Sequence, residues 1–84
     1  MYTYQTRGVC SQAINFELAE DNTVHNVSFY GGCNGNLKGI GRLVEGMEAQ
    51  KVVDLLKGTQ CGMKPTSCPD QLSKALAAAL EQRG

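Results

Sequence analysis

The sequence predicts an α+β fold, with an antiparallel sheet of about three strands followed by three helices packed on one face of it. Two observations lead to this prediction. Apolar and polar residues alternate through much of the first 30 positions, which is typical of half-buried strands. From position 34 the apolar residues recur every three or four positions, which is typical of amphipathic helices. At 84 residues, 42% of them hydrophobic, the whole chain 1–84 is expected to form a single domain with a modest core.

The first two strands are expected at residues 2–6 and 13–19. The first, YTYQT, is short and rich in β-branched and aromatic residues. The second, AINFELA, alternates strictly, so that Ile14, Phe16 and Leu18 share one face of the strand. We expect that face to be the buried one.

A turn and a return strand are expected next. The segment EDNT at 20–23 is rich in residues that hydrogen-bond their own backbone in turns. The segment VHNVSFY at 24–30 would then place His25, Val27 and Phe29 on the apolar face. His25 is therefore expected to be a hydrogen-bonded histidine of the core, because no adjacent carboxylate or serine motif marks it as a ligand or a base.

Three helices are expected, each with one apolar stripe that packs on the sheet. The first begins near residue 34 and stops at Gly46, and the second, 48–58, ends at its final glycine. The third, 69–82, has Pro69 at its first helical position. The stripes consist of Leu37, Ile40 and Val44 in the first helix, Ala49, Val52, Val53 and Leu56 in the second, and Leu72, Ala75, Leu76, Ala79 and Leu80 in the third.

Charge and hydropathy narrow the possible partners and location. Eight basic and eight acidic residues give zero formal charge without a long basic run, which argues against nucleic-acid binding. No run of about 18 apolar residues occurs, so no membrane span is expected. The N-terminus lacks the apolar region of a secretory signal, and a cytoplasmic location is therefore expected. Since cytoplasmic thiols are usually reduced, the cysteines point toward metal or redox chemistry more than toward structural disulfides.

Four cysteines, Cys10, Cys33, Cys61 and Cys68, are the candidate site residues. Cys33 and Cys68 each precede an expected helix, and the positive end of a helix dipole stabilises a thiolate. If the elements pack as expected, the four thiols would meet at one end of the domain in a tetrahedral Cys₄ site. Zinc is the expected metal, with iron or an iron–sulfur cluster as the alternative.

Other interpretations of the thiols stay open. The cysteines are separated by 22, 27 and 6 residues, without the close pairs of familiar zinc modules. Cys61 and Cys68 are near enough in sequence for a thiol–disulfide relay, in which Cys68 attacks and Cys61 resolves. Inert buried thiols in a partner-binding domain are the third interpretation.

The glycine-rich segment GGCNGNLKG at 31–39 suggests a phosphate-binding loop only weakly. Glycines and Lys38 precede or open the first expected helix, but the spacing matches neither the P-loop nor the dinucleotide-binding pattern. Nucleotide binding is thus a minor alternative, and the sequence leaves the oligomeric state open.

Four segments together resemble the TSCPD domain family, in its short stand-alone branch with four cysteines. They are GGCNGNLKGI, LVEG, LLKGTQCG and TSCPDQLSKAL, which spread over nearly the whole chain. The resemblance implies that Cys10, Cys33, Cys61 and Cys68 form the four-cysteine set of that branch.

The resemblance also implies a possible partner. Related TSCPD domains form the C-terminal end of adenosylcobalamin-dependent ribonucleotide reductases, so a ribonucleotide reductase is a candidate partner, as is another protein. The chain itself is not expected to be a reductase, because 84 residues cannot house the barrel, the radical cofactor and the cysteine triad of that enzyme. The expected function is therefore that of a small metal-binding accessory or interaction module, with no enzymatic activity of its own.

Overall fold

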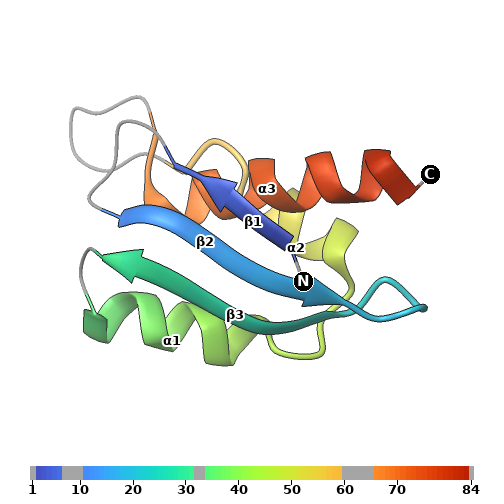
Figure 1. Ribbon diagram of the computed structural model, residues 1–84, viewed down its shortest axis with the longest axis horizontal. Coiled ribbons are helices and arrows are strands. Elements are labelled where there is room, and N and C mark those ends of the chain that lie inside the picture. The colour runs from blue at the N-terminus through green and yellow to red at the C-terminus, as the bar shows by residue number, and fades with distance from the viewer. Residues whose placement is uncertain (1, 7–10, 32–33, 60–65, 84) are drawn as a thin grey trace.

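A computed structural model describes residues 2–6, 11–31, 34–59 and 66–83 of the chain. Three antiparallel strands in the order β1-β2-β3 are followed by three helices, which confirms the expected α+β fold (Figure 1). The elements are β1 (Tyr2–Gln5), β2 (Ser11–Leu18), β3 (Val24–Gly31), α1 (Asn34–Val44), α2 (Ala49–Leu56) and α3 (Cys68–Arg83).

The paired strands β1 and β2 form a sheet face that is apolar and lies against the helices. Tyr2 lies opposite Phe16, and their rings stack with centroids 5.3 Å apart. Ile14 and Phe16 are almost fully buried, as the alternation in the sequence predicts. On the opposite face the Thr3 hydroxyl donates to Asn15 Oδ1 at 2.8 Å, so that this side of the sheet is polar.

A bulge in β3 overturns the prediction for His25. Asn26 has φ 56°, in the left-handed region, and the β2–β3 register shifts between Asn15 and Glu17. An extra residue in one strand reverses the in–out alternation. Val24 is buried while His25 pairs with Glu17 and is half-exposed, so His25 is not a core histidine.

The predicted helix ends are confirmed for α1 and α2. Gly46 and Gly58, the expected stops, have φ values of +79° and +81°, which glycine adopts without steric cost. The start of α3 differs by one residue from the prediction. The Ser67 carbonyl accepts the first helical hydrogen bond, from Gln71 N–H at 2.8 Å, so Ser67 is the N-cap and Pro69 is the second helical residue.

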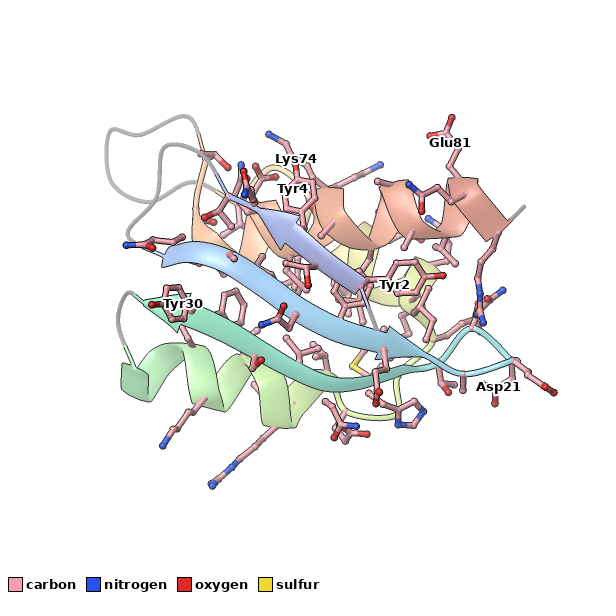
Figure 2. All side chains as sticks on the ribbon, viewed as in Figure 1. Tyr2, Tyr4, Asp21, Tyr30, Lys74 and Glu81 are labelled. Atoms are coloured by element: carbon pink, nitrogen blue, oxygen red, sulfur yellow. The ribbon has the colours of Figure 1, made fainter. Side chains whose placement is uncertain are left out.

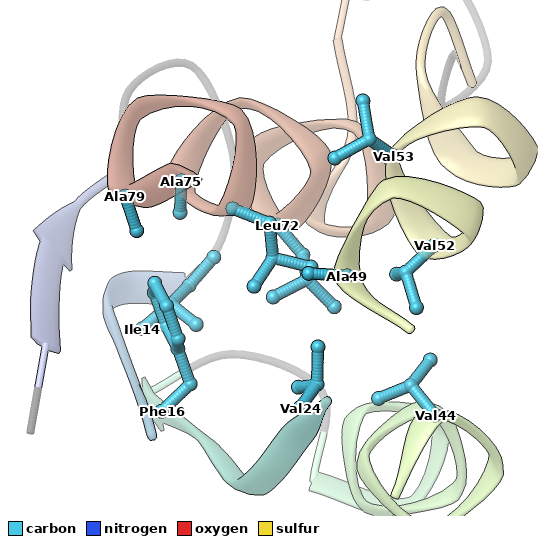
Figure 3. Packing of buried hydrophobic residues seen from close by; sticks show 11 residues of the cluster. Ile14, Phe16, Val24, Val44, Ala49, Val52, Val53, Leu72, Ala75 and Ala79 are labelled. Carbon is cyan, nitrogen blue, oxygen red and sulfur yellow. The ribbon is translucent and has the colours of Figure 1, made fainter. Parts of the chain in front are cut away.

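The core lies between the sheet and the helices, and α2 and α3 supply one side of it. Figure 3 shows Ile14, Phe16 and Val24 of the strands facing residues of α2 and α3. Most of the expected apolar stripes belong to this cluster, against which Ile40, Leu56 and Leu80 pack while partly buried. The cluster contains Ile14, Phe16, Val24, Val44, Ala49, Val52, Val53, Leu72, Ala75, Leu76 and Ala79. Within the described ranges, no helix has the length and hydropathy needed to cross a membrane.

Candidate functional site

The start of α3 is fixed by a buried hydrogen-bond network of its own residues. Ser67 Oγ accepts a hydrogen bond from Asp70 N–H at 3.2 Å, as an N-cap side chain does. The Thr66 hydroxyl donates to Asp70 Oδ2 and accepts from Gln71 Nε2 at 3.0 Å. Thr66, Ser67, Asp70 and Gln71 are all buried, so each bond forms away from competing water.

Asp70 is the central acceptor of this network. The hydrogen bond from Thr66 is the main reason that the pKa of Asp70 lies below its ordinary value, and the bonds from Gly58 N–H and Lys74 act in the same direction against the opposing effect of burial. Lys74 Nζ lies 3.3 Å from Asp70 Oδ2, one helical turn away. The buried carboxylate is therefore held in its charged form by surrounding donors.

The network also closes the chain segment that precedes α3. Asp70 Oδ1 accepts a 2.7 Å bond from Gly58 N–H, and Ser67 Oγ donates to the Thr59 carbonyl at 2.7 Å. The end of α2 is thus tied to the start of α3 on both sides of residues 60–65. The side chains of Ser67 and Asp70 therefore hold the start of α3, where Cys68 lies, next to Gly58 and Thr59, which precede Cys61 in the sequence.

Cys68 is the one candidate ligand among the described residues. It is the first residue of α3, directly after the N-cap, and its exposed fraction is 8%. Cys10, Cys33 and Cys61 lie outside the described residues. Across the ranges that the structure does describe, no group of three or more His, Cys, Asp or Glu side chains could hold a metal ion. The predicted Cys₄ site therefore stays a prediction.

The described residues that flank the cysteines nevertheless occur at one end of the domain. Ser11, which follows Cys10, pairs with Gly31 of β3, and Thr6 N–H donates to Gln12 O at 3.1 Å across the same end of the sheet. Helices α1 and α3 also begin at this end (Figure 1).

A second polar cluster lies at the opposite end of the sheet, beside the turn that carries Asp21 (Figure 2). His25 Nδ1 lies 2.6 Å from Glu45 Oε2, and His25 Nε2 lies 2.8 Å from Thr23 Oγ1. The Thr23 hydroxyl also lies 2.7 Å from Asp21 Oδ1. Sequence reasoning missed this cluster, since Glu45 is 20 residues away from His25 and no local motif connects them.

The two carboxylates of this cluster are stabilised in their charged form. The Thr23 hydroxyl is the main cause of a lowered pKa at Asp21. At Glu45 the main cause is Asn26 N–H, which donates at 2.8 Å, followed by His25, and the pKa is again lowered. Beside the cluster is an open cavity of about 540 Å³, lined by His25 and Glu17 among others.

Arg83 closes one side of that cavity and joins the end of α3 to the β2–β3 turn. Its guanidinium donates to the Ala19 carbonyl, to Asn22 Oδ1 at 2.8 Å and to the Leu18 carbonyl at 3.3 Å. Asn22 has φ 65°, a turn conformation that asparagine tolerates. Arg83 is thus engaged by the protein's own turn, and it holds the far end of α3 against the sheet.

These features define a class of small α+β domain in which a buried cysteine begins the last helix behind a polar cap. The family model of the TSCPD domain matches residues 2–80, and the chain therefore belongs to the TSCPD domain family. This confirms the resemblance found in the sequence, and the letters TSCPD stand in this chain at residues 66–70, where the cap is built. No curated protein and no solved structure matches the chain significantly.

Proposed function

We propose that the protein is a cytoplasmic metal-binding accessory module in which Cys10, Cys33, Cys61 and Cys68 hold one zinc ion. One observation carries the proposal: Cys68 is buried at the first position of α3, inside a network that also fixes Gly58 and Thr59. A structural metal site needs ligands with fixed positions, and the network fixes one ligand and the start of the segment that bears another.

Chain connectivity supports the convergence of the other three thiols. Consecutive Cα atoms are about 3.8 Å apart, so a residue adjacent to a fixed position cannot lie far from it. Cys10 directly precedes Ser11, Cys33 directly precedes Asn34 of α1, and Cys61 is two residues beyond Thr59. The flanking residues Ser11 and Asn34 belong to the end of the domain at which α3 begins.

Burial of Cys68 favours metal binding over a thiol–disulfide relay. An attacking thiol must reach the disulfide of another molecule, and reactive cysteines are partly exposed for that reason. With an exposed fraction of 8%, Cys68 presents little surface to such a partner. Thiolate ligands of a structural zinc site, by contrast, are commonly closed off from solvent. A relay between Cys61 and Cys68 is therefore the second candidate.

Metal content of protein purified under reducing conditions tests the proposal. We expect close to one equivalent of zinc per chain by elemental analysis, since a structural site is nearly full. Cys10→Ser and Cys68→Ser should each remove most of the bound metal and lower the free energy of unfolding by more than about 2 kcal/mol. Less than about 0.1 equivalent of zinc or iron, even after reconstitution, would exclude the metal site.

A matched control separates ligand loss from general damage. His25→Gln removes the single histidine, which Thr23 and Glu45 engage at the other end of β3, and it should leave the zinc content unchanged. If Cys10→Ser keeps the wild-type metal content and melting temperature while Cys68→Ser loses disulfide exchange with thioredoxin, the four-cysteine site is excluded and the relay stands. The two proposals differ at Cys10, because only a four-ligand site requires it.

The proposed role in the cell is support of another protein. We assign no catalytic step to the cavity at the His25 end, which is open to solvent. Family resemblance makes a ribonucleotide reductase the candidate partner. Co-purification of the two with intact zinc, lost in Cys10→Ser, is the expected result.

A further inference from the structure

His25 is engaged through both nitrogens of its ring. Nδ1 lies 2.6 Å from Glu45 Oε2, and Nε2 lies 2.8 Å from Thr23 Oγ1. The Thr23 hydroxyl lies in turn 2.7 Å from Asp21 Oδ1, in the β2–β3 turn (Figure 2). The three contacts form one continuous chain, which joins the residue after α1 to this turn through the His25 ring.

This chain of contacts requires three hydrogens, one for each contact. The pKa values of Asp21 and Glu45 are both lowered, so both are carboxylates at neutral pH, and carboxylates only accept hydrogen bonds. The Thr23 hydroxyl supplies one hydrogen. The other two must come from the His25 ring, which carries two only as the imidazolium. All three contacts are therefore hydrogen bonds only while His25 is protonated.

Loss of one proton from His25 to the solvent leaves two hydrogens for three contacts. Nδ1 keeps its hydrogen, because the Glu45 carboxylate at 2.6 Å would repel a lone pair on that nitrogen. Nε2 then carries the lone pair and can only accept, so the Thr23 hydroxyl turns away from Asp21 and toward His25. Asp21 thereby loses one donor and keeps the backbone N–H of Thr23, which donates at 3.1 Å.

We propose that the Thr23 hydroxyl is a proton-dependent switch, which donates to Asp21 when His25 is charged and to His25 when the ring is neutral. Histidine is the residue type that serves such switches near neutral pH. Through the hydroxyl, a proton gained or lost by the ring changes the hydrogen bonds of a carboxylate that lies one side chain further along the chain of contacts.

The β2–β3 turn is the part of the fold that responds. Its backbone is closed by hydrogen bonds from Ala19 N–H to Thr23 O at 3.0 Å and from Asn22 N–H to Ala19 O at 2.9 Å. Asp21 adds its bonds to the N–H and the hydroxyl of Thr23, and Arg83 attaches the end of α3 to the same turn. The turn is therefore held more tightly while the hydroxyl donates to Asp21, which is the protonated state.

The surroundings of His25 limit the size of this effect. Glu17 accepts a hydrogen bond from Asn26 Nδ2, and Arg83 donates to carbonyls of the turn, so both have other partners. The His25 and Glu45 side chains are 36% and 47% exposed, so water replaces part of the lost bond and the loosening is modest. The titratable and charged groups around the ring are Tyr2 of β1, Glu17 of β2, Asp21 of the turn, Glu45 after α1 and Arg83 of α3.

Nuclear magnetic resonance of the isotope-labelled full chain, in reductant and between about pH 5 and about pH 8.5, tests the switch. The ring nitrogens of His25 report its charge and its tautomer, and the neutral ring should carry its hydrogen on Nδ1. The carboxyl carbon of Asp21 should change its chemical shift with the same midpoint as the ring. Its own protonation does not interfere, because the pKa of Asp21 lies below its ordinary value of 3.8.

Two substitutions of Thr23 separate the hydroxyl from a direct effect of the ring's charge. Thr23→Val removes the hydroxyl but keeps the branched shape, and it should abolish most of the Asp21 response at the His25 midpoint. Thr23→Ser keeps a hydroxyl and should retain the response. The Glu45 carboxyl carbon should respond in the wild type and in both variants, which shows that the ring is still in place.

Amide hydrogen exchange measures the consequence for the turn. After correction for the intrinsic effect of pH, the protection of the Ala19 and Asn22 amides should fall about threefold to tenfold as His25 becomes neutral, since one hydrogen bond is lost. The same fall should occur in Thr23→Ser. In Thr23→Val the protection should not depend on the charge of His25.

Four results would overturn the proposal. An Asp21 carbon that does not respond at the His25 midpoint would show that the hydroxyl stays where it is. An equal response in Thr23→Val would assign the effect to charge acting through space. A neutral ring with its hydrogen on Nε2 would leave the hydroxyl on Asp21, and unchanged amide protection in the wild type would mean that the turn does not loosen.

Discussion

Asp70 on α3 and Gly58 beyond the end of α2 are joined by a 2.7 Å hydrogen bond from Gly58 N–H to Asp70 Oδ1. The Thr66 hydroxyl donates to the other oxygen of the same buried carboxylate. We predict that Asp70→Ala lowers the free energy of unfolding by about 2–4 kcal/mol, since it leaves the buried Thr66 hydroxyl and the Gly58 N–H without their acceptor. Urea unfolding measures the loss.

An exposed aspartate provides the control for this substitution. Asp54 on α2 accepts a hydrogen bond from Gln50 at 3.0 Å on the surface. Its replacement by alanine should change the free energy of unfolding by less than about 0.5 kcal/mol. Equal losses for Asp70→Ala and Asp54→Ala would show that the network around Asp70 does not stabilise the fold.

The lowered pKa of Asp70 predicts a dependence of stability on pH. The unfolded chain, in which Asp70 has its ordinary pKa of 3.8, binds the proton at a higher pH than the folded chain does. The contribution of Asp70 is thus complete above that value and is lost as the pH falls through the folded pKa. Between about pH 5 and pH 3, stability should fall less steeply in Asp70→Asn than in the wild type.

This comparison is needed because other carboxylates act in the same direction. Asp21 and Glu45 also have lowered pKa values, so the wild type loses stability in acid for more than one reason. The difference between the wild type and Asp70→Asn isolates one group. Parallel curves for the two proteins would contradict the assigned role of Asp70.

Two glycines of α1 offer a matched pair of substitutions. A Cβ at Gly39 would meet no atom within 4 Å, whereas one at Gly41 would lie 2.9 Å from the backbone oxygen of Val27. In a helix interior, alanine is more favourable than glycine by up to about 1 kcal/mol of free energy. Gly39→Ala should therefore raise the melting temperature and Gly41→Ala should lower it, because the β3 backbone has to shift. Equal changes of the same sign would contradict the close packing of α1 on β3.

His25 should influence the ionisation of Glu45 more than that of Asp21. Asn26 N–H is the largest cause of the lowered Glu45 pKa and His25 the next, whereas at Asp21 His25 is the smallest. We predict that His25→Ala raises the Glu45 pKa part of the way toward its ordinary value. Carboxyl carbon chemical shifts followed against pH measure both groups. A larger rise at Asp21 would contradict the contacts described for His25.

The helices of this protein could be predicted because their signals are local. One short segment contains both signals for α2, the apolar spacing of Ala49, Val52 and Val53 and the terminal Gly58. The structure has a helix with those residues buried and a left-handed glycine after its end. The start of α3 was misplaced by one residue, since proline is accepted at more than one position of a first turn and Ser67 supplied the cap.

The face of His25 could not be predicted because it depends on one backbone conformation. Asn26 adopts a left-handed conformation within β3, and this bulge reverses the alternation on which the prediction relied. The burial of Asp70 and Ser73 could not be predicted from the sequence either. A polar residue is buried where partners from distant segments satisfy it, and Gly58 is 12 residues away from Asp70.

The candidate site was predicted from cysteine positions, and the structure adds the cap that holds one of them. Cys68 was expected directly before α3, because Pro69 was placed at the first helical position, whereas Cys68 is itself the first residue of the helix, after Ser67 as the N-cap. Convergence of the four thiols depends on loop conformations that no periodicity encodes, and it stays a prediction.

The hydrogen bonds around α3 also differ in the number of residues that separate their partners along the sequence. Gly58 and Asp70 are 12 residues apart, and Thr59 and Ser67 are 8 apart, whereas Arg83 reaches Ala19 across 64 residues. Short loops lose less entropy on closing, so the α2–α3 junction can form in the folding transition state before the sheet is docked. Stopped-flow measurements should then show that Asp70→Ala mainly slows folding, with a φ-value above about 0.5, while Arg83→Ala mainly accelerates unfolding. The junction would in that case act as the folding nucleus of the domain, and the family signature at residues 66–70 would set the rate at which the chain folds as well as the position of Cys68.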